Sequence, residues 1–256
     1  MLVVIDIGNT NITIGIFDED KLIGNYRLTT KVRRTSDEYG FMLKTFLDNS
    51  NVHRDNIDDV IVSSVVPKVM HSFRNGIIKF IGIDPIVVGP GVKSGISIQL
   101  ENPKSVGSDR IADAAGAFHE YGGPVLVVDF GTATTYDFID EKGRFTCGAI
   151  SVGIETGANA LWTQTAQLPE IEIKHPITIK AKNTKTEMQA GIFYQYLGGV
   201  EYTISQFKKE LGRDFKVVAT GGLGRVVCDY SRQIDIYDPN LIFKGLKVIY
   251  DKNKNL

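Results

Sequence analysis

Cysteine, tryptophan and long apolar runs are scarce in this chain of 256 residues. Its two cysteines, Cys147 and Cys228, lie far apart, which argues against a disulfide-stapled scaffold and favours a reducing, cytoplasmic compartment. No apolar run approaches the roughly 18 residues that a membrane span needs. The acidic Asp6 also comes too early for the apolar core of a signal peptide. We therefore expect a cytoplasmic protein without a membrane partner.

An excess of charge of one sign is missing as well. Lys and Arg number 29 against 30 for Asp and Glu, so the formal net charge is −1. Without a basic surplus there is no electrostatic footprint for nucleic acid, and we expect no nucleic-acid partner. The four histidines show no metal-ligand spacing. Hydrophobic residues make up 43% and charged residues 23%, which is ordinary for a globular chain.

The chain contains an internal repeat. Both VVIDIGNTNITIGIFDEDKLIG, which begins at Val3, and LVVDFGTATTYDFIDEKGRFTCG, which begins at Leu126, consist of an apolar run, Asp-x-Gly, a small polar cluster and an alternating strand. Asp6 aligns with Asp129 at an offset of 123 residues, nearly half the chain. Chance similarity of two hairpins is the alternative, but the shared order of features favours a duplicated fold.

The remaining pattern predicts strands alternating with helices, and hence an α/β protein. We expect helices over 36–49, 67–81, 153–165, 186–210 and 238–250, and strands over 59–64 and within 216–222. Paired glycines after a predicted helix place a boundary near 115–122. The prediction is two similar halves, residues 1–117 and 118–256, each a mixed sheet flanked by helices.

Asp6 and the residues after it form a candidate phosphate site. Gly8 lets the backbone approach a ligand closely, and amides in such a turn bind phosphate oxygens. An aspartate at a strand end also suits a hydrated cation. A polar hairpin turn is the alternative, but the similar turn after Asp129 favours two phosphate-binding hairpins.

Two further clusters carry candidate chemistry. Gly107-Ser108-Asp109-Arg110 combines a carboxylate, able to accept a hydroxyl proton, with a guanidinium suited to an anionic substrate. The alternative is a helix N-cap by Ser108 or Asp109. Asn183-Thr184 is the second candidate cluster, and the alternative is that it forms the N-cap of the following helix.

Taken together, these segments resemble the superfamily of sugar and acetate kinases, actin and heat-shock chaperones, and within it the type III pantothenate kinases. DIGNTNITIG at 6–15, ENPKSVGSDR at 101–110 and DFGTATTYD at 129–137 are similar to that family's motifs, and CGAISVGIETGANAL, KNTKTEMQAGIFY and ATGGLG follow in its order. The resemblance implies a duplicated ribonuclease H-like, or actin-like, fold. Two positions depart from the family pattern, Leu100 in place of Tyr and Val152 in place of Pro.

The resemblance implies ATP-dependent phosphorylation of pantothenate to 4′-phosphopantothenate, the first step of coenzyme A biosynthesis. It makes Asp109 the catalytic proton acceptor. It implies Mg²⁺ with ATP, held through water by Asp6, and a monovalent cation, K⁺ or NH₄⁺, at Asp129. It also implies a homodimer with shared active sites, in which Thr184 reaches the partner's pocket. ATP is assigned to Asp6, Ile7, Gly8, Asn9, Thr10, Asn11, Ile12, Thr13 and Thr132. Pantothenate is assigned to Gly107, Ser108, Asp109, Arg110 and Thr184.

Two other functions stay open. A catalytically silent binding or regulatory protein on the same fold is one, because fold does not fix function. The presence of Asp6, Asp109, Arg110 and Asp129 favours an enzyme. A kinase or phosphatase for a different small metabolite is the other, since the substrate is assigned by resemblance around 101–110 and 183–184.

Overall fold

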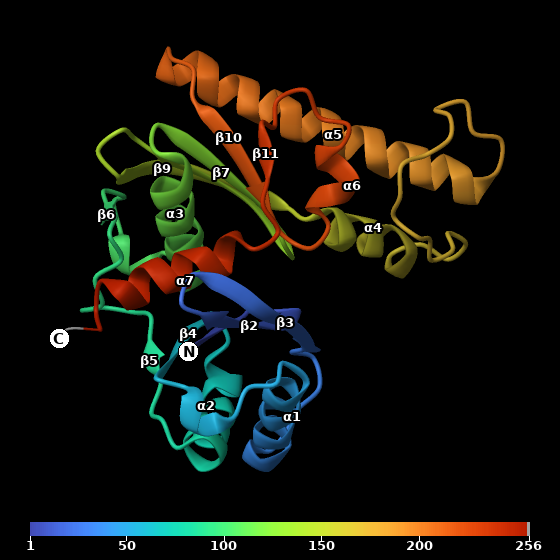
Figure 1. The fold of residues 1–256 in the computed structure, drawn as a ribbon. Helices are drawn as coiled ribbons and strands as arrows, with labels where there is room; N and C mark the ends of the chain where they lie inside the picture. Colours follow the sequence, from blue (N-terminus) through green and yellow to red (C-terminus); the bar gives the residue numbers. More distant parts are fainter. Residues whose placement is uncertain (255–256) are drawn as a thin grey trace. The chain divides into compact units, whose positions relative to one another are not determined.

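The computed structural model describes residues 1–254, and they form two compact units. The first unit is Met1–Glu120 together with the C-terminal segment that begins at Leu241, and the second is Tyr121–Asn240. Each unit is built on a mixed sheet with helices against it, which confirms the predicted α/β class (Figure 1).

The first unit carries its own sheet, which runs in the order β3-β2-β1-β4-β5. Neighbours β1, β2 and β3 are antiparallel, whereas β1, β4 and β5 are parallel. Its elements in chain order are β1 (Leu2–Ile7), β2 (Asn11–Asp18), β3 (Lys21–Thr29), α1 (Ser36–Asn49), the 3₁₀ turn Arg54–Asn56, β4 (Asp59–Ser64), α2 (Pro67–Ile81), β5 (Ile86–Val87), β6 (Ser97–Ile98), the 3₁₀ turn Pro103–Ser105, α3 (Ser108–Tyr121) and α7 (Leu241–Asp251).

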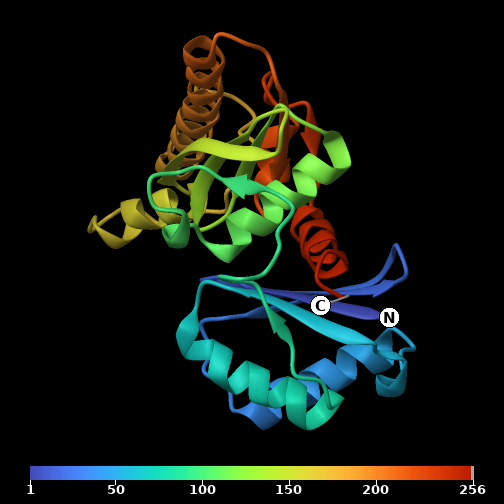
Figure 2. The ribbon, with the colours of Figure 1, turned by 90° about the vertical axis from the view of Figure 1, so that its left-hand side faces the viewer.

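Strand β1 is buried on both faces because its alternate residues belong to two different cores. Val3, Ile5 and Ile7 pack into the core under α1 and α2. Leu2 and Val4 point the other way, into a core that includes Phe243 and Leu246 of α7. Figures 1 and 2 show α1 and α2 on one face of this sheet and α7 on the other. Asp6 shares the parity of Leu2 and Val4 and therefore faces the α7 side.

Helix α7 comes from the end of the chain but completes the first unit. It lies against β1 and β4, and it crosses α3 where Gly245 faces Ala112 and Gly116. Compactness therefore places the C-terminal segment with residues 1–120. The division into repeated halves 1–117 and 118–256 describes the duplication rather than these units, and it stays a prediction.

The second unit repeats the first strand for strand. Its strands run in the order β11-β10-β7-β8-β9, with β7, β8 and β9 antiparallel and β7, β10 and β11 parallel. This is the order of the first unit with β7 in the place of β1, so the duplicated fold is confirmed. The elements are β7 (Val125–Phe130), β8 (Ala133–Ile139), β9 (Arg144–Val152), α4 (Ile154–Thr163), α5 (Thr184–Leu211), β10 (Lys216–Thr220), α6 (Gly224–Cys228) and β11 (Ile236–Tyr237).

Helix α5 covers one face of the second sheet (Figure 1). Leu126, Val128 and Phe130 of β7 pack with Val200 and Ile204 of α5 in one core. Asp129 has the opposite parity and lies on the other face, as Asp6 lies away from α1 and α2. The two aspartates therefore occupy the same strand position and the corresponding face in each unit.

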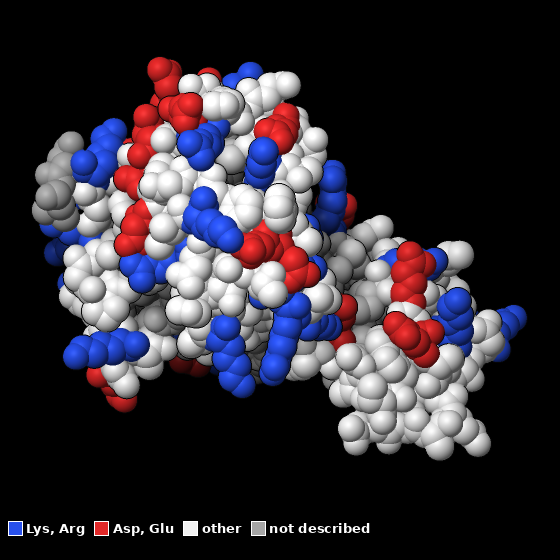
Figure 3. Space-filling view, turned by 90° about the horizontal axis from the view of Figure 1, so that it is seen from below, with Lys and Arg blue, Asp and Glu red and all other residues white. Residues whose placement is uncertain are grey.

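Charged side chains of both signs are interspersed on the face drawn in Figure 3. This mixture agrees with the formal net charge of −1. Within residues 1–254, no helix has both the length and the hydropathy to cross a bilayer.

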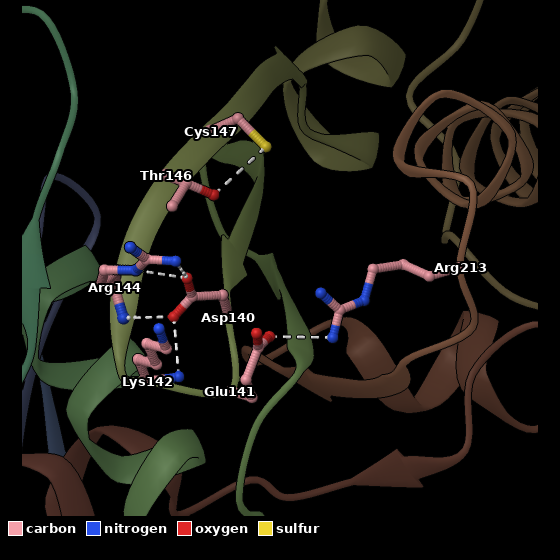
Figure 4. A network of polar contacts seen from close by, with 7 residues as sticks. All are labelled: Asp140, Glu141, Lys142, Arg144, Thr146, Cys147 and Arg213. Atoms are coloured by element: carbon pink, nitrogen blue, oxygen red, sulfur yellow. Dashed lines mark hydrogen bonds and ion pairs between the residues drawn. The ribbon is translucent and has the colours of Figure 1, made fainter.

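The turn between β8 and β9 is organised by Asp140, whose surroundings are drawn in Figure 4. Its Oδ1 accepts hydrogen bonds from the amides of Lys142 and Arg144 at 2.9 and 3.0 Å, and its Oδ2 pairs with the Arg144 guanidinium at 2.5 Å. Burial acts to raise the pKa of Asp140, but these hydrogen bonds and the ion pair outweigh it and hold the pKa below its usual value.

We expect Asp140→Asn to destabilise the protein at neutral pH by about 1–3 kcal/mol, because charge-assisted hydrogen bonds are lost. Since the folded-state pKa is depressed, this stability is fully present above the unfolded-state pKa and disappears as pH falls through the folded-state pKa. Thermal unfolding between pH 7 and pH ~3 should show that the difference in stability between variant and wild type becomes smaller in acid. A gap independent of pH would contradict this account.

Candidate active site

The first predicted phosphate segment, 6–13, folds as one strand–turn–strand unit. Asp6 is next to last in β1, and the turn begins at Gly8, whose amide donates to the Asn11 carbonyl at 3.0 Å. The Thr30 hydroxyl donates to the Gly8 carbonyl at 2.8 Å and ties the turn to the end of β3. A Cβ on Gly8 would lie 3.2 Å from the Asn11 oxygen, so the turn is tight. The result is a fixed polar turn beside the Asp6 carboxylate.

The second predicted segment is built in the same way. Asp129 is next to last in β7, and the Gly131 amide donates to the Ala133 carbonyl at 3.1 Å. Thr132 is exposed at the tip, and its carbonyl accepts from the Thr156 hydroxyl at 2.7 Å. The tip is therefore anchored to the first turn of α4. Asp129 and Thr132, assigned from the sequence to a cation and to ATP, flank one turn.

In both units the aspartate lies between two hydroxyl residues on the neighbouring strands. Directly opposite residues of paired strands point to the same face, so the three side chains form a short polar row. We call each set a hydroxyl–carboxylate row. The first row is Thr13, Asp6 and Ser63, and the second is Thr135, Asp129 and Thr220. Each sheet thus has the same oxygen-rich row of side chains next to its predicted phosphate turn.

The third cluster, 107–110, starts helix α3 and is fastened to the first row by Ser108. The Ser108 hydroxyl accepts from the Ser63 hydroxyl at 2.9 Å and from the Ser64 amide at 3.0 Å, and it lies 3.1 Å from the Ser64 carbonyl, to which it donates. All three bonds go to the end of β4, so the alternative that Ser108 caps its own helix is wrong. Ser63 is fully buried, so this link is shielded from water.

Asp109 is held in a defined orientation. Its Oδ1 accepts from the Arg110 amide at 2.8 Å. The same oxygen would lie only 2.3 Å from a Cβ on residue 107, so a side chain at Gly107 would displace the carboxylate. Because Ser63 pairs with Asp6 in register and bonds Ser108, the first unit brings the predicted catalytic residue and the predicted ATP segment together.

Thr184 is the first residue of α5 and is exposed. The N-cap hypothesis for this segment is confirmed for Asn183, whose Oδ1 accepts from the Thr186 amide at 3.1 Å. Within the second unit Thr184 lies on a different element from Asp129 and Thr132. Its contact with substrate stays a prediction.

Comparison with known sequences then decides the family. A sequence model described as type III pantothenate kinase matches residues 2–206. The chain belongs to the type III pantothenate kinase family. A type III pantothenate kinase of Bifidobacterium longum subsp. infantis is 58% identical over 99% of both chains, one of Agathobacter rectalis is 52% identical over 98% of this chain and 97% of its own, and one of Listeria welshimeri is 44% identical over 99% and 98%.

Solved structures support the fold of this type III pantothenate kinase family member. The activator of 2-hydroxyisocaproyl-CoA dehydratase from Clostridium difficile matches with a TM-score of 0.55 at 14% identity, covering 99% of this chain and 96% of its own. The ROK hexokinase from Thermus thermophilus matches with a TM-score of 0.51 at 13% identity, covering 100% and 99%. At these identities the similarity concerns the actin-like kinase fold alone.

Sequence reasoning missed Ser63 and Ser64, which fasten α3, and Thr135, which flanks Asp129. A signal for Ser63 was present, because it continues the alternation of β4 on the face of Ile61 at the polar end of an apolar strand. Recognising its importance needed the parallel register of β1 and β4, which local pattern does not contain.

Proposed function

We infer that this chain transfers the γ-phosphoryl group of ATP to the terminal hydroxyl of pantothenate, giving 4′-phosphopantothenate for coenzyme A synthesis. Matches to type III pantothenate kinases over 99% of the chain support this function. The observation that carries the chemistry is the link from Asp6 through Ser63 and Ser108 to Asp109. It holds a candidate proton acceptor in fixed relation to the predicted phosphate-binding turn.

Phosphoryl transfer depends mainly on positioning and on neutralising charge. We assign to Asp109 the orientation of the substrate hydroxyl and the acceptance of its proton during the transfer. Arg110 supplies a guanidinium for the carboxylate end of pantothenate. Gly107 keeps the space that the Asp109 carboxylate needs, and Ser108 fixes the helix end that carries both charges.

The phosphates are assigned to the two turns, 6–13 and the one at Thr132. No group of three or more His, Cys, Asp or Glu in the described part of the chain is arranged to hold a metal ion. Asp6 therefore suits Mg²⁺ that is bound mainly by ATP and water, and Asp129 with its flanking threonines suits a K⁺ or NH₄⁺ ion. When bound, these cations neutralise the negative charge of the triphosphate.

The residues of the second hydroxyl–carboxylate row fit a monovalent cation. A Cβ on residue 221 would lie 2.5 Å from Asp129 Oδ1, and Gly221 has a φ of +95°, which favours glycine. A Cβ on residue 131 would lie 3.4 Å from Asp129 Oδ2. Glycines at both positions thus let the backbone lie close to the carboxylate oxygens, where a side chain would crowd them.

The function is tested by coupled measurement of ADP formation with and without pantothenate, in potassium and in sodium buffers. We expect turnover only when pantothenate is present, and faster turnover in potassium. A silent regulatory protein would bind ATP without turnover. A kinase for another metabolite would turn over only when a different alcohol is supplied.

A homodimer is proposed on the surface of the second unit. Ile150 and Val152 of β9 and Tyr202 of α5 are 63, 57 and 68% exposed, although Ile150 pairs with Thr135 and so lies on the face of the sheet away from α5. Beside them lies a pocket of about 380 Å³ between β9, α4 and α5, to whose lining Val152 and Leu161 contribute. Large exposed apolar surface marks protein contacts. We propose that a second copy of this chain covers this apolar surface.

A cytoplasmic location of the protein stays a prediction.

Mixing of variants tests whether active sites are shared between subunits. We pair inactive Asp109→Asn with a Thr184 variant whose homodimer is also nearly inactive. If Thr184 completes the partner's site, each mixed dimer has one site with both lesions and one with neither. Activity should then recover toward half of wild type per exchanged dimer.

The control is a mixture of Asp109→Asn with Asp6→Asn. Both lesions lie in the first unit of their chains, so every site of the mixed dimer keeps one and no recovery is expected. Absence of recovery with the Thr184 variant, despite verified subunit exchange, would show that each site is built within one chain. Thr184 would then be only the first residue of a helix.

A further inference from the structure

Two threonine hydroxyls are buried without a hydrogen-bond partner anywhere in residues 1–254, and they are Thr13 Oγ1 and Thr135 Oγ1. They occupy the same place in the duplicated fold. Each lies on the second strand of its hairpin, opposite the aspartate of its hydroxyl–carboxylate row. Burying a hydroxyl without a partner destabilises a protein. The same destabilisation at equivalent positions of two units indicates that these hydroxyls serve to bind something other than the protein itself.

The neighbour of Thr135 shows what an ordinary buried threonine does here. Thr134 faces the opposite side of β8, is fully buried, and pairs its hydroxyl with the Tyr196 hydroxyl of α5. Partners for hydroxyls are therefore available to this strand. The missing partner is specific to the face that carries Asp129.

The surroundings of Thr135 are suited to a cation. Asp129 lies opposite it on β7, and Thr220 flanks Asp129 on β10. The row therefore offers one carboxylate and neutral hydroxyl oxygens. Hard cations take oxygen ligands, and a single carboxylate matches the single charge of an alkali ion. Glycines at 131 and 221 keep side-chain atoms away from the carboxylate, because a Cβ there would lie 3.4 and 2.5 Å from its oxygens.

We propose that Thr135 Oγ1 is an oxygen ligand, together with the Asp129 carboxylate, of a monovalent alkali cation at the end of β7. The proposal rests on the proposed function for the cation's role near ATP. It adds to that function a residue whose place is set by strand register. It also explains why the hydroxyl is tolerated without a partner, since its partner is the ion.

The test uses three variants of the full chain and measures Tm and the Kd of a fluorescent ATP analogue. Each is titrated with KCl at constant ionic strength, with choline chloride as the replacement salt. Thr135→Val keeps the shape of the side chain and removes the hydroxyl. Thr135→Ser keeps the hydroxyl. Thr134→Val is the matched control on the other face of the strand.

We expect Thr135→Val to have a Tm without potassium equal to or above that of wild type, because an unpartnered hydroxyl is replaced by a methyl group. Its half-saturating potassium concentration should rise at least about tenfold, seen both in Tm and in the Kd of the ATP analogue. Thr135→Ser should keep the potassium response. Thr134→Val should lose Tm, because Tyr196 is left without its partner, yet keep that response.

Three results would overturn the proposal. The first is an unchanged potassium response in Thr135→Val. The second is a clear fall in its Tm without potassium, which would show that the hydroxyl has a structural partner. The third is a wild-type protein without any potassium response. Failure of the proposed function is seen separately, as absence of pantothenate-dependent ADP formation in the wild type.

Discussion

Asp109→Asn should lower kcat by roughly 10²–10⁴-fold while leaving folding and ATP binding close to wild type. The amide keeps the size of the side chain and an oxygen that accepts the Arg110 amide, which now donates to Asp109 Oδ1 at 2.8 Å. It removes the negative charge and the proton acceptor. Steady-state kinetics give kcat, and Tm with the Kd of an ATP analogue report the two properties expected to be unchanged.

A surface aspartate of the same unit provides the control. Asp84 forms an exposed ion pair with Arg74 at 2.5 Å, and Asp84→Asn should leave kcat unchanged. If Asp109→Asn instead kept a kcat near that of wild type, Asp109 would not be the proton acceptor. A fall in Tm together with kcat would assign it a structural role.

Gly245→Ala should cause the largest loss of stability among single methyl additions. A Cβ at this position would lie 1.8 Å from the Ala112 carbonyl oxygen, where α7 crosses α3. A backbone oxygen within a helix does not yield as a flexible side chain does, so the two helices must separate. We expect a loss of about 3 kcal/mol, or a fall in Tm of roughly 10 °C.

The matched control is Gly191→Ala in α5, where an added Cβ meets nothing within 4 Å. There the better helix propensity of alanine should stabilise the protein by about 0.5–1 kcal/mol. Thermal unfolding of both variants distinguishes a steric effect at the crossing of α7 and α3 from the general effect of replacing a helical glycine by alanine. Equal Tm values for Gly245→Ala and wild type would refute this close approach of α7 and α3.

Helices and strands whose signal is local were predictable from the sequence. The helix predicted over 36–49 is α1, which starts after Thr35 in a capping box with Glu38. The strand predicted over 59–64 is β4. The helix expected from 238 starts three residues later, because Asp238 instead accepts from the Tyr121 hydroxyl and the Asn240 amide. Periodicity does not reveal such a tertiary hydrogen bond.

The parts of the site that pattern did not predict depend on register. Ser63 and Ser108 are 45 residues apart, and their hydrogen bond exists because β4 lies beside β1 and α3 starts at its end. The motif after Asp129 contains consecutive threonines, but only strand pairing shows that Thr135 faces the carboxylate while Thr134 faces α5. The sequence predicted which segments form the candidate site, and strand pairing determines which of their side chains face it.

The place of α7 bears on how the protein is made. A ribosome releases Leu2, Val4 and Ile61 early, yet the helix whose Phe243 and Leu246 complete their core follows the whole of the second unit in the chain. The second unit, Tyr121–Asn240, is by contrast one continuous stretch. Domains fold as units during synthesis, so the second unit can fold first, while the apolar face of the N-terminal sheet that packs against α7 stays uncovered until α7 has been synthesised.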